Sequence, residues 1–382
     1  DMTNPRKMMM GAAGVAGGEV TTEGSLYSTG DNQFGQLGSG DTTRRRTFAR
    51  VGSVATWKEL SCDEWSSAAI RTDGTLWTWG RNSYGGLGQG STTNLTAPTQ
   101  VGSLTNWSKV KNLTGGFIAL KTDGTIWVCG SNAQGQLGQG DVINRSSPVQ
   151  VGSGTDYASV GGFTSLMAIK TNGTAWTWGS GASGEHGQGN VLNISSPTQL
   201  GSLTNWVRTA IGSGPSNHQV AVKTDGTIWG WGSNYAGRAI PNGTETPQSS
   251  PVQIGSLTTW SQGREKSSAG NAFHLWIKTD GTLWAWGNNP QGQLGDGTKT
   301  TRTTPVQIGA KTDWAEVACG VSSAQAINEN GELWAWGDNS GNYYGLGLGD
   351  AVDRSSPVQV GSENTWGQSA MGYGHSIGFH TA

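Results

Sequence analysis

One pattern recurs seven times along this chain: a short apolar segment, a turn that ends in glycine and a Trp-rich segment. Its clearest copy, KTDGTLWAWGNNPQGQLGDGT, covers residues 278–298. The turn glycines follow one another at steps of 49 to 55 residues, at Gly24, Gly74, Gly124, Gly173, Gly226, Gly281 and Gly331. A repeat of this period is typical of propellers and solenoids, and it argues against an enzyme built on one core.

Each unit has the pattern of antiparallel strands. In LWAWG, Trp284 and Trp286 lie on one face of the segment, as the two-residue alternation of a strand requires. Asp280-Gly281 is a tight-turn pair that closes a hairpin with the apolar segment before it. After a Gly-rich loop, residues 305–309 (PVQIG) begin with a proline, which suits an outer edge. An aromatic residue follows in every unit, at Trp57, Trp107, Tyr157, Trp206, Trp260, Trp314 and Trp366.

These segments predict an all-β fold, a seven-bladed β-propeller with four antiparallel strands per blade. Residues 20–382 form the propeller, and residues 1–19 form a separate N-terminal arm. We expect stacks of tryptophan rings between blades to make the scaffold rigid. The structural tryptophans are Trp77, Trp79, Trp127, Trp176, Trp178, Trp229, Trp231, Trp284, Trp286, Trp334 and Trp336.

The two ends of the repeat region complement each other. Residues 375–381 have the pattern of a second strand, and residues 24–30 have the pattern of the turn and third strand. Joining them gives a complete unit. We therefore predict that these segments pair and close the ring, which removes the open edge of a solenoid.

The motif WGxNxxGQLGxG at residues 286–297, followed by PxQVG-like segments, resembles the repeat of the regulator of chromosome condensation family. The resemblance covers residues 20–382 and implies the family's seven-bladed propeller. It would also imply nucleotide exchange on the small GTPase Ran. The family's histidine at the start of the second strand is present only at His218 and His375, with His274 one place off. The resemblance therefore supports the fold and does not extend to the exchange activity.

Composition and motifs predict a protein that is not an enzyme and binds no cofactor or metal. The sequence has no HExxH, CxxC or EF-hand spacing, and GSGASG at residues 179–184 is a variant of the Gly-rich loop rather than a phosphate site. The turn aspartates Asp73, Asp123, Asp225 and Asp280 are spread over four units and cannot form an acid–base pair. The three cysteines are expected as buried free thiols.

The charge of the chain bounds its partners. Charged residues make up 13% of the sequence, and the formal net charge is -2. These values predict no general attraction to nucleic acid or to anionic membranes. No apolar run approaches the ~20 residues that span a bilayer, so no membrane insertion is expected.

The N-terminal arm carries a second resemblance. Its segment NPRKMMMGAAG is similar to the opening of virion proteins from marine tailed phages that carry these same repeats. This similarity implies attachment to other virion or scaffold proteins and a place in the phage particle; a cytoplasmic or secreted protein is the alternative. The expected assembly residues are Arg6, Lys7, Met8, Met9 and Met10.

The repeat departs from its own length in four loops of the last three units. They lie at residues 212–217, 234–245, 263–270 and 339–347. Because strands alternate in direction, all four loops are expected on one face. Neutral drift of surface loops is one interpretation, and recognition by an aromatic and charged patch is the other. The candidate binding residues are Tyr235, Arg238, Arg264, Glu265, Lys266, Tyr343 and Tyr344.

The sequence favours a non-enzymatic structural and interaction propeller, most directly a phage virion component that presents a recognition face to a host surface protein or glycan. A glycan-binding lectin and a guanine-nucleotide exchange factor remain alternatives, and a hydrolase is the least favoured. Arg44, Arg45 and Arg46 form a basic triplet in the first Gly-rich loop. Either it is solvated or it contacts an acidic partner.

Overall fold

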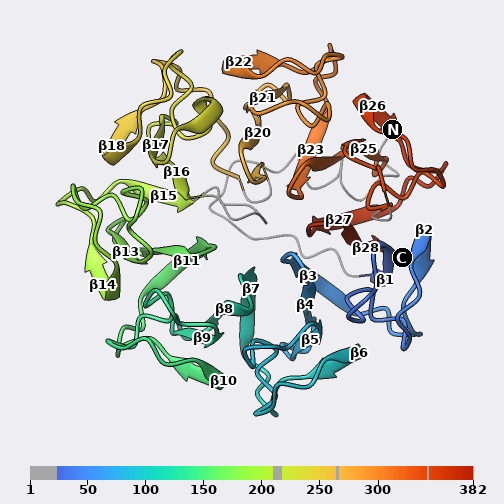
Figure 1. Cartoon of the computed structure of the whole chain (residues 1–382), viewed down its shortest axis with the longest axis horizontal. Helices are drawn as coiled ribbons and strands as arrows, with labels where there is room; N and C mark the ends of the chain where they lie inside the picture. Colours follow the sequence, from blue (N-terminus) through green and yellow to red (C-terminus); the bar gives the residue numbers. More distant parts are fainter. Residues whose placement is uncertain (1–23, 210–216, 264–265, 342–343, 382) are drawn as a thin grey trace, which may run out of the picture.

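The computed structural model describes residues 24–209, 217–263, 266–341 and 344–381. Within these ranges the regular elements are antiparallel strands and one short 3-10 helix, η1 (Tyr235–Gly237). The sheets stand as wedges around a central axis, with strands such as β7, β11 and β23 nearest the axis and β10, β14 and β22 at the rim (Figure 1). The chain is therefore an all-β propeller with four-stranded antiparallel blades. No helix in the described ranges is long and apolar enough to cross a membrane.

Five sheets have four strands each, in sequence order from axis to rim. Their bounds are β7–β10, Trp107–Leu113, Gly116–Lys121, Ile126–Gly130 and Arg145–Gln150; β11–β14, Tyr157–Gly162, Ser165–Lys170, Ala175–Gly179 and Ile194–Gln199; β15–β18, Trp206–Thr209, His218–Lys223, Ile228–Gly232 and Gln248–Gln253; β19–β22, Ser267–Ala269, Phe273–Ile277, Leu283–Gly287 and Arg302–Gln307; and β23–β26, Trp314–Cys319, Ser323–Asn328, Leu333–Gly337 and Arg354–Gln359.

The sixth sheet has eight strands and contains the junction of the two chain ends. Its order is β27-β28-β1-β3-β4-β5-β6, with β2 on the side of β1. A single residue pair, Gly24 with Trp57, joins β1 to β3. The bounds are β1 Gly24–Gly30, β2 Arg45–Arg50, β3 Trp57–Cys62, β4 Ser66–Arg71, β5 Leu76–Gly80, β6 Leu95–Gln100, β27 Trp366–Met371 and β28 His375–Thr381.

The predicted closure is confirmed in its register. β28 pairs with β1 without a break, from Gly24 opposite Thr381 to Gly30 opposite His375. Ile377 and Phe379 of β28 are completely buried at this junction, where they pack with Leu26. The C-terminal strand therefore completes a sheet that the N-terminal strands begin.

Tryptophan holds the blades together, but not through the predicted ring stacks between blades. The Trp–Trp ring pairs among the described residues, such as Trp57 with Trp77 at 6.0 Å, join side chains of one blade in edge-to-face geometry. The link to the preceding blade is a hydrogen bond: Trp79 Nε1 donates to the Gln36 carbonyl at 2.8 Å. Cys129 takes the same position, and its Sγ donates to the Gly86 carbonyl at 3.2 Å. The expectation of stacking is corrected accordingly, while the three cysteines are buried and free as predicted.

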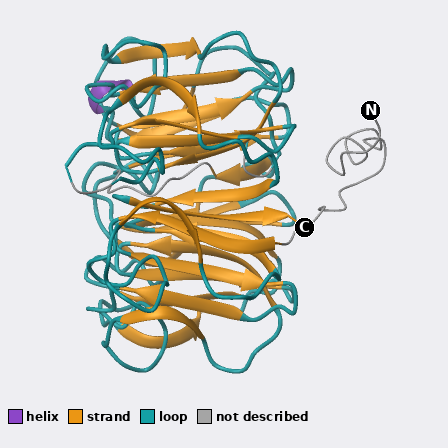
Figure 2. Cartoon of the chain, turned by 90° about the vertical axis from the view of Figure 1, so that its right-hand side faces the viewer, coloured by secondary structure: helices purple, strands orange, loops and turns teal. Residues whose placement is uncertain are grey.

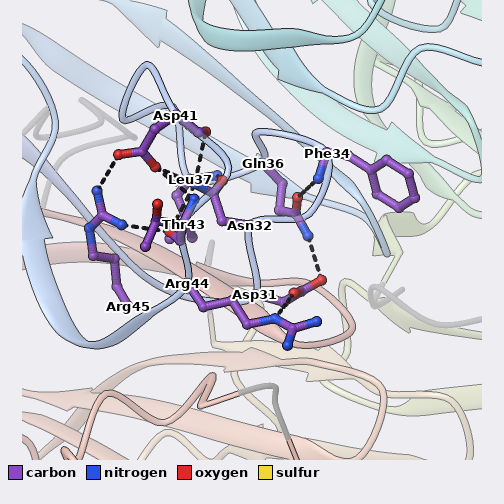
Figure 3. A network of polar contacts seen from close by, with 9 residues as sticks. All are labelled: Asp31, Asn32, Phe34, Gln36, Leu37, Asp41, Thr43, Arg44 and Arg45. Carbon is purple, nitrogen blue, oxygen red and sulfur yellow. Dashed lines mark hydrogen bonds and ion pairs between the residues drawn. The ribbon is translucent and has the colours of Figure 1, made fainter.

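A buried asparagine organises each regular Gly-rich loop and explains the conserved spacing of WGxN within the repeat. Asn132 is 0% exposed. Its Nδ2 donates to the carbonyls of Asp141 and Ile143, and its Oδ1 accepts the backbone N–H of Leu137 at 2.8 Å. Asn32 makes the same contacts in the first unit (Figure 3). One side chain therefore satisfies backbone groups that the irregular loop leaves without strand partners.

Replacing this asparagine should destabilise the fold measurably. We expect Asn132→Ala to lower the free energy of unfolding by about 2–4 kcal/mol, because each buried bond contributes about 1 kcal/mol and an orphaned buried group costs about 1–3 kcal/mol. Urea unfolding measures the change. Asn330→Ala, at an exposed turn position, is the matched control and should stay within about 0.5 kcal/mol of the parent. Equal losses in the two variants would contradict the loop-organising role.

The alternating strands give the disc two different faces, seen edge-on in Figure 2. Hairpin turns such as Asp73-Gly74 lie on one face, where the Asp73 carboxylate accepts the backbone N–H of Thr75. The connections between first and second strands and between third and fourth strands lie on the other face, which we call the loop face. It contains η1. The fourth strand of the sixth unit begins at Arg302, three residues before the expected 305–309.

Candidate recognition site

The predicted binding residues are only partly described. Arg264, Glu265 and Tyr343 lie outside the described residues, as do Arg6, Lys7, Met8, Met9 and Met10 of the predicted arm. Tyr235 stands out from the loop face with 58% of its surface exposed, and Lys266 is half-buried. Their role in binding stays a prediction.

Arg238 joins the β17–β18 connection, which carries it, to the β19–β20 connection of the next sheet. Its Nη1 donates to the Asn271 carbonyl at 3.1 Å, and its Nη2 donates to Ser233 Oγ at 2.6 Å. Its own carbonyl accepts the Trp286 indole N–H at 3.1 Å. Burial lowers the pKa of this guanidinium. Arg238 therefore supports the loop face from inside.

Tyr344 is also an internal residue, with 9% of its surface exposed. Its hydroxyl accepts a hydrogen bond from Arg46 Nη2 at 3.0 Å, and the Arg46 guanidinium lies 4.6 Å from its ring centroid. The tyrosine has a φ of 52°, a left-handed conformation that is costly for a bulky side chain. Its contact with Arg46 ties the loop of the last unit to the first.

The basic triplet is likewise paired within the chain, as Figure 3 shows for two of its members. Arg44 Nε lies 2.6 Å from Asp31 Oδ1, and the Asp31 carboxylate is buried. Arg45 Nη2 lies 2.7 Å from Asp41 Oδ2, and the arginine holds the pKa of Asp41 below its ordinary value. Since Arg46 contacts Tyr344, all three arginines have partners within the protein, while Arg44 and Arg46 are also exposed to solvent. A contact of this triplet with an acidic partner stays a prediction.

A different cleft on the loop face combines aromatic and ionisable side chains. It has a volume of about 190 Å³ and lies where three connections of two neighbouring sheets meet. Trp65 comes from the β3–β4 connection, Tyr84 from the β5–β6 connection and Thr114 from the β7–β8 connection. The other lining residues are Asp63, Glu64, Ser66, Arg81, Ser83 and Gly115.

An aromatic row extends from the cleft across the ring junction. The rings of Trp65 and Tyr373 have centroids 5.4 Å apart and are tilted by 36°. Phe34 meets Trp65 edge-to-face, also at 5.4 Å, and the Arg81 guanidinium lies 5.1 Å from the Phe34 centroid. Tyr84 and Tyr373 are 47% and 36% exposed. Contact surfaces of proteins are enriched in such aromatic and arginine side chains.

A buried carboxyl group holds the cleft in shape. Asp63 Oδ1 accepts the backbone N–H groups of Trp65 and Ser66, at 2.9 and 2.6 Å, and Oδ2 accepts that of Gly115 at 3.3 Å. Burial raises the pKa of Asp63 to about 6 in spite of these bonds. Asp63 thus fixes the Trp65 backbone and connects two neighbouring sheets.

The cleft also contains polar side chains. The buried Thr114 Oγ1 has no hydrogen-bond partner among the described residues. Glu64 is half-buried, and burial raises its pKa while the nearby Arg81 opposes the shift. Arg81 Nε donates to Ser83 Oγ at 2.9 Å. The site therefore offers both donors and acceptors beside aromatic surface.

Comparison with known families fits this architecture. The model for the Regulator of chromosome condensation (RCC1) repeat matches residues 73–116, 123–165, 280–327 and 330–378, and a second model of the same description matches residues 58–85. The chain belongs to the RCC1 repeat family. The matched segments include the connections that carry Trp65, Tyr84 and Thr114.

Curated relatives match over part of the chain. The human E3 ubiquitin-protein ligase HERC2 is 26% identical over 150 residues, which are 38% of this chain and 3% of HERC2. The Ultraviolet-B receptor UVR8 of Arabidopsis thaliana is 31% identical over 170 residues, 42% of this chain and 37% of UVR8. The chain thus matches well under two thirds of the length of either relative.

Solved structures share the fold over nearly the whole chain. Human WBSCR16 superposes with a TM-score of 0.81 at 20% identity, covering 94% of this chain and 100% of that structure. Prp20p from Saccharomyces cerevisiae gives 0.80 at 17% identity, covering 95% and 93%. These similarities establish the RCC1-type propeller fold.

The sequence interpretation missed the cleft although a signal was present. The residue before each second strand is Trp65 in one RCC1 repeat and small or polar in the others: Gly115, Thr164, Asn217, Ala272, Ser322 and Gly374. A comparison of the repeats at that one position would have identified Trp65. The search for changes in loop length could not, because this connection has the ordinary length.

Proposed function

We propose that this protein is a non-enzymatic recognition module, a seven-bladed propeller that binds a partner through its loop face. Seven blades follow if the eight-stranded sheet is divided at the single Gly24–Trp57 pair, since each half then has four strands like the other five sheets. The rigid ring holds loops from separate blades in fixed positions. Recognition residues can therefore be carried by the loops without disturbing the core.

The aromatic cleft is the observation that carries this proposal. Trp65, Tyr84 and Tyr373 come from three different connections and meet on one face beside Glu64 and Arg81. Partly exposed aromatic side chains in a concave site supply much of the binding energy of protein interfaces and ligand sites. Related proteins are consistent with a role in recognition: UVR8 is a receptor, and the Prp20p structure is described together with binding to Gsp1p and histones.

The finer proposal places this module in a phage virion, attached through residues 1–19. It rests on the resemblance of NPRKMMMGAAG to virion proteins with these repeats. Mass spectrometry of purified particles of the phage that encodes the chain should find its peptides in a constant ratio to the major capsid protein. Particles without these peptides would refute the virion role and leave the recognition module in place.

Binding of the labelled full-length protein to host cells tests the recognition function. We expect saturable binding that falls at least about tenfold in the double variant Trp65→Ala, Tyr373→Ala, because a central aromatic contact is worth about 2 kcal/mol or more. Leu192→Ala, another exposed side chain on the loop face, is the control and should bind like the parent. Absence of saturable binding, or equal binding by the double variant, would contradict the proposal.

A further inference from the structure

The ligand of the cleft must match a mixture of hydrogen-bonding groups. Glu64 and Thr114 supply acceptors, while Arg81, Ser83 and the Tyr84 hydroxyl supply donors. Thr114 is the most specific of these residues, because it lines the cleft and its buried Oγ1 has no hydrogen-bond partner in the part of the chain that the structure describes. Buried polar groups without a partner are costly, so a ligand that bonds to this hydroxyl gains from it.

The walls of the cleft require a ligand that also has apolar surface. Trp65 and Tyr84 line the cavity, and the rings of Tyr373 and Phe34 both contact the ring of Trp65. Tyr84 also packs tightly over Gly115, where an added Cβ would come within 2.7 Å of its ring. The glycine thus keeps the tyrosine close to the backbone and leaves the space between the rings open.

The charges of the cleft disfavour ionic ligands. A phosphate or carboxylate would meet Asp63 and Glu64, and a cation would meet the Arg81 guanidinium at the rim. Both oxygens of Asp63 already accept backbone N–H groups, which leaves the aspartate little capacity to bind an ammonium group. A neutral ligand whose groups both donate and accept hydrogen bonds fits these restrictions.

We propose that the cleft between Trp65, Tyr84 and Thr114 binds one neutral hexopyranose unit of a glycan. Such a sugar has a face of C–H groups that can lie against an aromatic ring, and hydroxyls around its edge that donate and accept. The cavity of about 190 Å³ accommodates a single unit, and the row towards Tyr373 provides a surface for the next one. This inference rests on the proposed recognition function and names its ligand class.

Saturation-transfer difference NMR with methyl glucoside, galactoside, mannoside and their N-acetylated analogues tests the inference. We expect ring-proton signals from at least one of these neutral sugars with the full-length protein. Trp65→Ala should abolish them. Thr114→Val, which keeps the shape and removes only the unpartnered hydroxyl, should weaken affinity about fivefold to tenfold. Leu192→Ala, an exposed side chain in a different blade, should leave the signals unchanged.

The outcomes separate this inference from the recognition function. If no sugar gives a signal, or if the signal survives in Trp65→Ala, the hexopyranose site is wrong. If host-cell binding still depends on Trp65 and Tyr373 in that case, the recognition function stands with a protein ligand. If cell binding is absent as well, both proposals fail. Circular dichroism of each variant confirms that the propeller remains folded.

Discussion

Deleting residues 375–382 should abolish the cooperative unfolding transition of the propeller. The deletion removes β28, whose neighbours β27 and β1 would then both have open edges. It also removes the buried Ile377 and Phe379. Truncating such side chains costs about 2–5 kcal/mol each, and the total stability of a typical protein is about 5–15 kcal/mol. We expect a broad, non-cooperative signal in thermal denaturation, together with aggregation through the open edges.

A circular permutant supplies the matched control. Gly24 and Thr381 are paired residues, so a short turn of the Thr-Asp-Gly type can join β28 to β1 as it joins the equivalent strands of other blades. New ends placed between the exposed Gly152 and Ser153 keep every strand. This permutant should unfold cooperatively at or above the temperature of the parent. A cooperative transition in the deletion variant, or its loss in the permutant, would show that the ring does not depend on this closure.

The fold was predictable because the same pattern of strands and turns occurs in seven units of the sequence. Within each unit, the alternation in LWAWG, the glycine turn and the proline near the outer strand all predict the same four-stranded antiparallel arrangement. The register of closure was predictable for the same reason, since the segment from His375 and the segment from Gly24 are complementary parts of one unit. The tryptophan contacts were not, because sequence does not distinguish a ring stacked on the next blade from an indole N–H bonded to its backbone.

The recognition site was much less accessible to sequence reasoning. Arg238 and Tyr344 have the composition of a binding patch, but their partners are Asn271 and Arg46, which lie in other units of the chain. Only the three-dimensional arrangement shows that these side chains are used internally. The cleft is the reverse case, because its residues are far apart in the sequence. Ring closure brings Tyr373 beside Trp65.

Acidification should unfold the propeller through its buried histidines. Burial, and then the nearby Arg238, lower the pKa of His274 from the ordinary 6.5 to about 3. Its ring lies against His218, whose pKa is also lowered well below the ordinary value by burial and by the neighbouring charges. Burial lowers the pKa of His375 to about 4, although Asp31 opposes the shift, and its Nε2 lies 3.0 Å from Ser67 Oγ.

The direction of the effect follows from proton binding in the two states. Between pH 6.5 and the folded pKa values, the unfolded chain takes up protons at these histidines and the folded protein does not. Stability therefore falls as the pH drops below 6.5, by about 3 kcal/mol each for His274 and His375 at pH 4. Asp63 acts in the opposite sense, because its raised pKa of about 6 makes the folded state bind a proton first. The contribution of Asp63 to the free energy of unfolding therefore rises by about 2 kcal/mol as the pH falls from 6 to 4.

Urea unfolding at pH 7, 5.5 and 4 measures how the free energy of unfolding changes with pH. This slope can be compared between variants even when their stabilities at pH 7 differ. The parent should lose stability throughout this range. In His375→Gln the loss between pH 7 and pH 4 should shrink by about 3 kcal/mol, and in Asp63→Asn it should grow by about 2 kcal/mol. The two variants thus control for each other, since a general loosening of the fold would change both slopes in the same direction. A slope equal to that of the parent in His375→Gln would exclude this histidine as an acid-sensitive group.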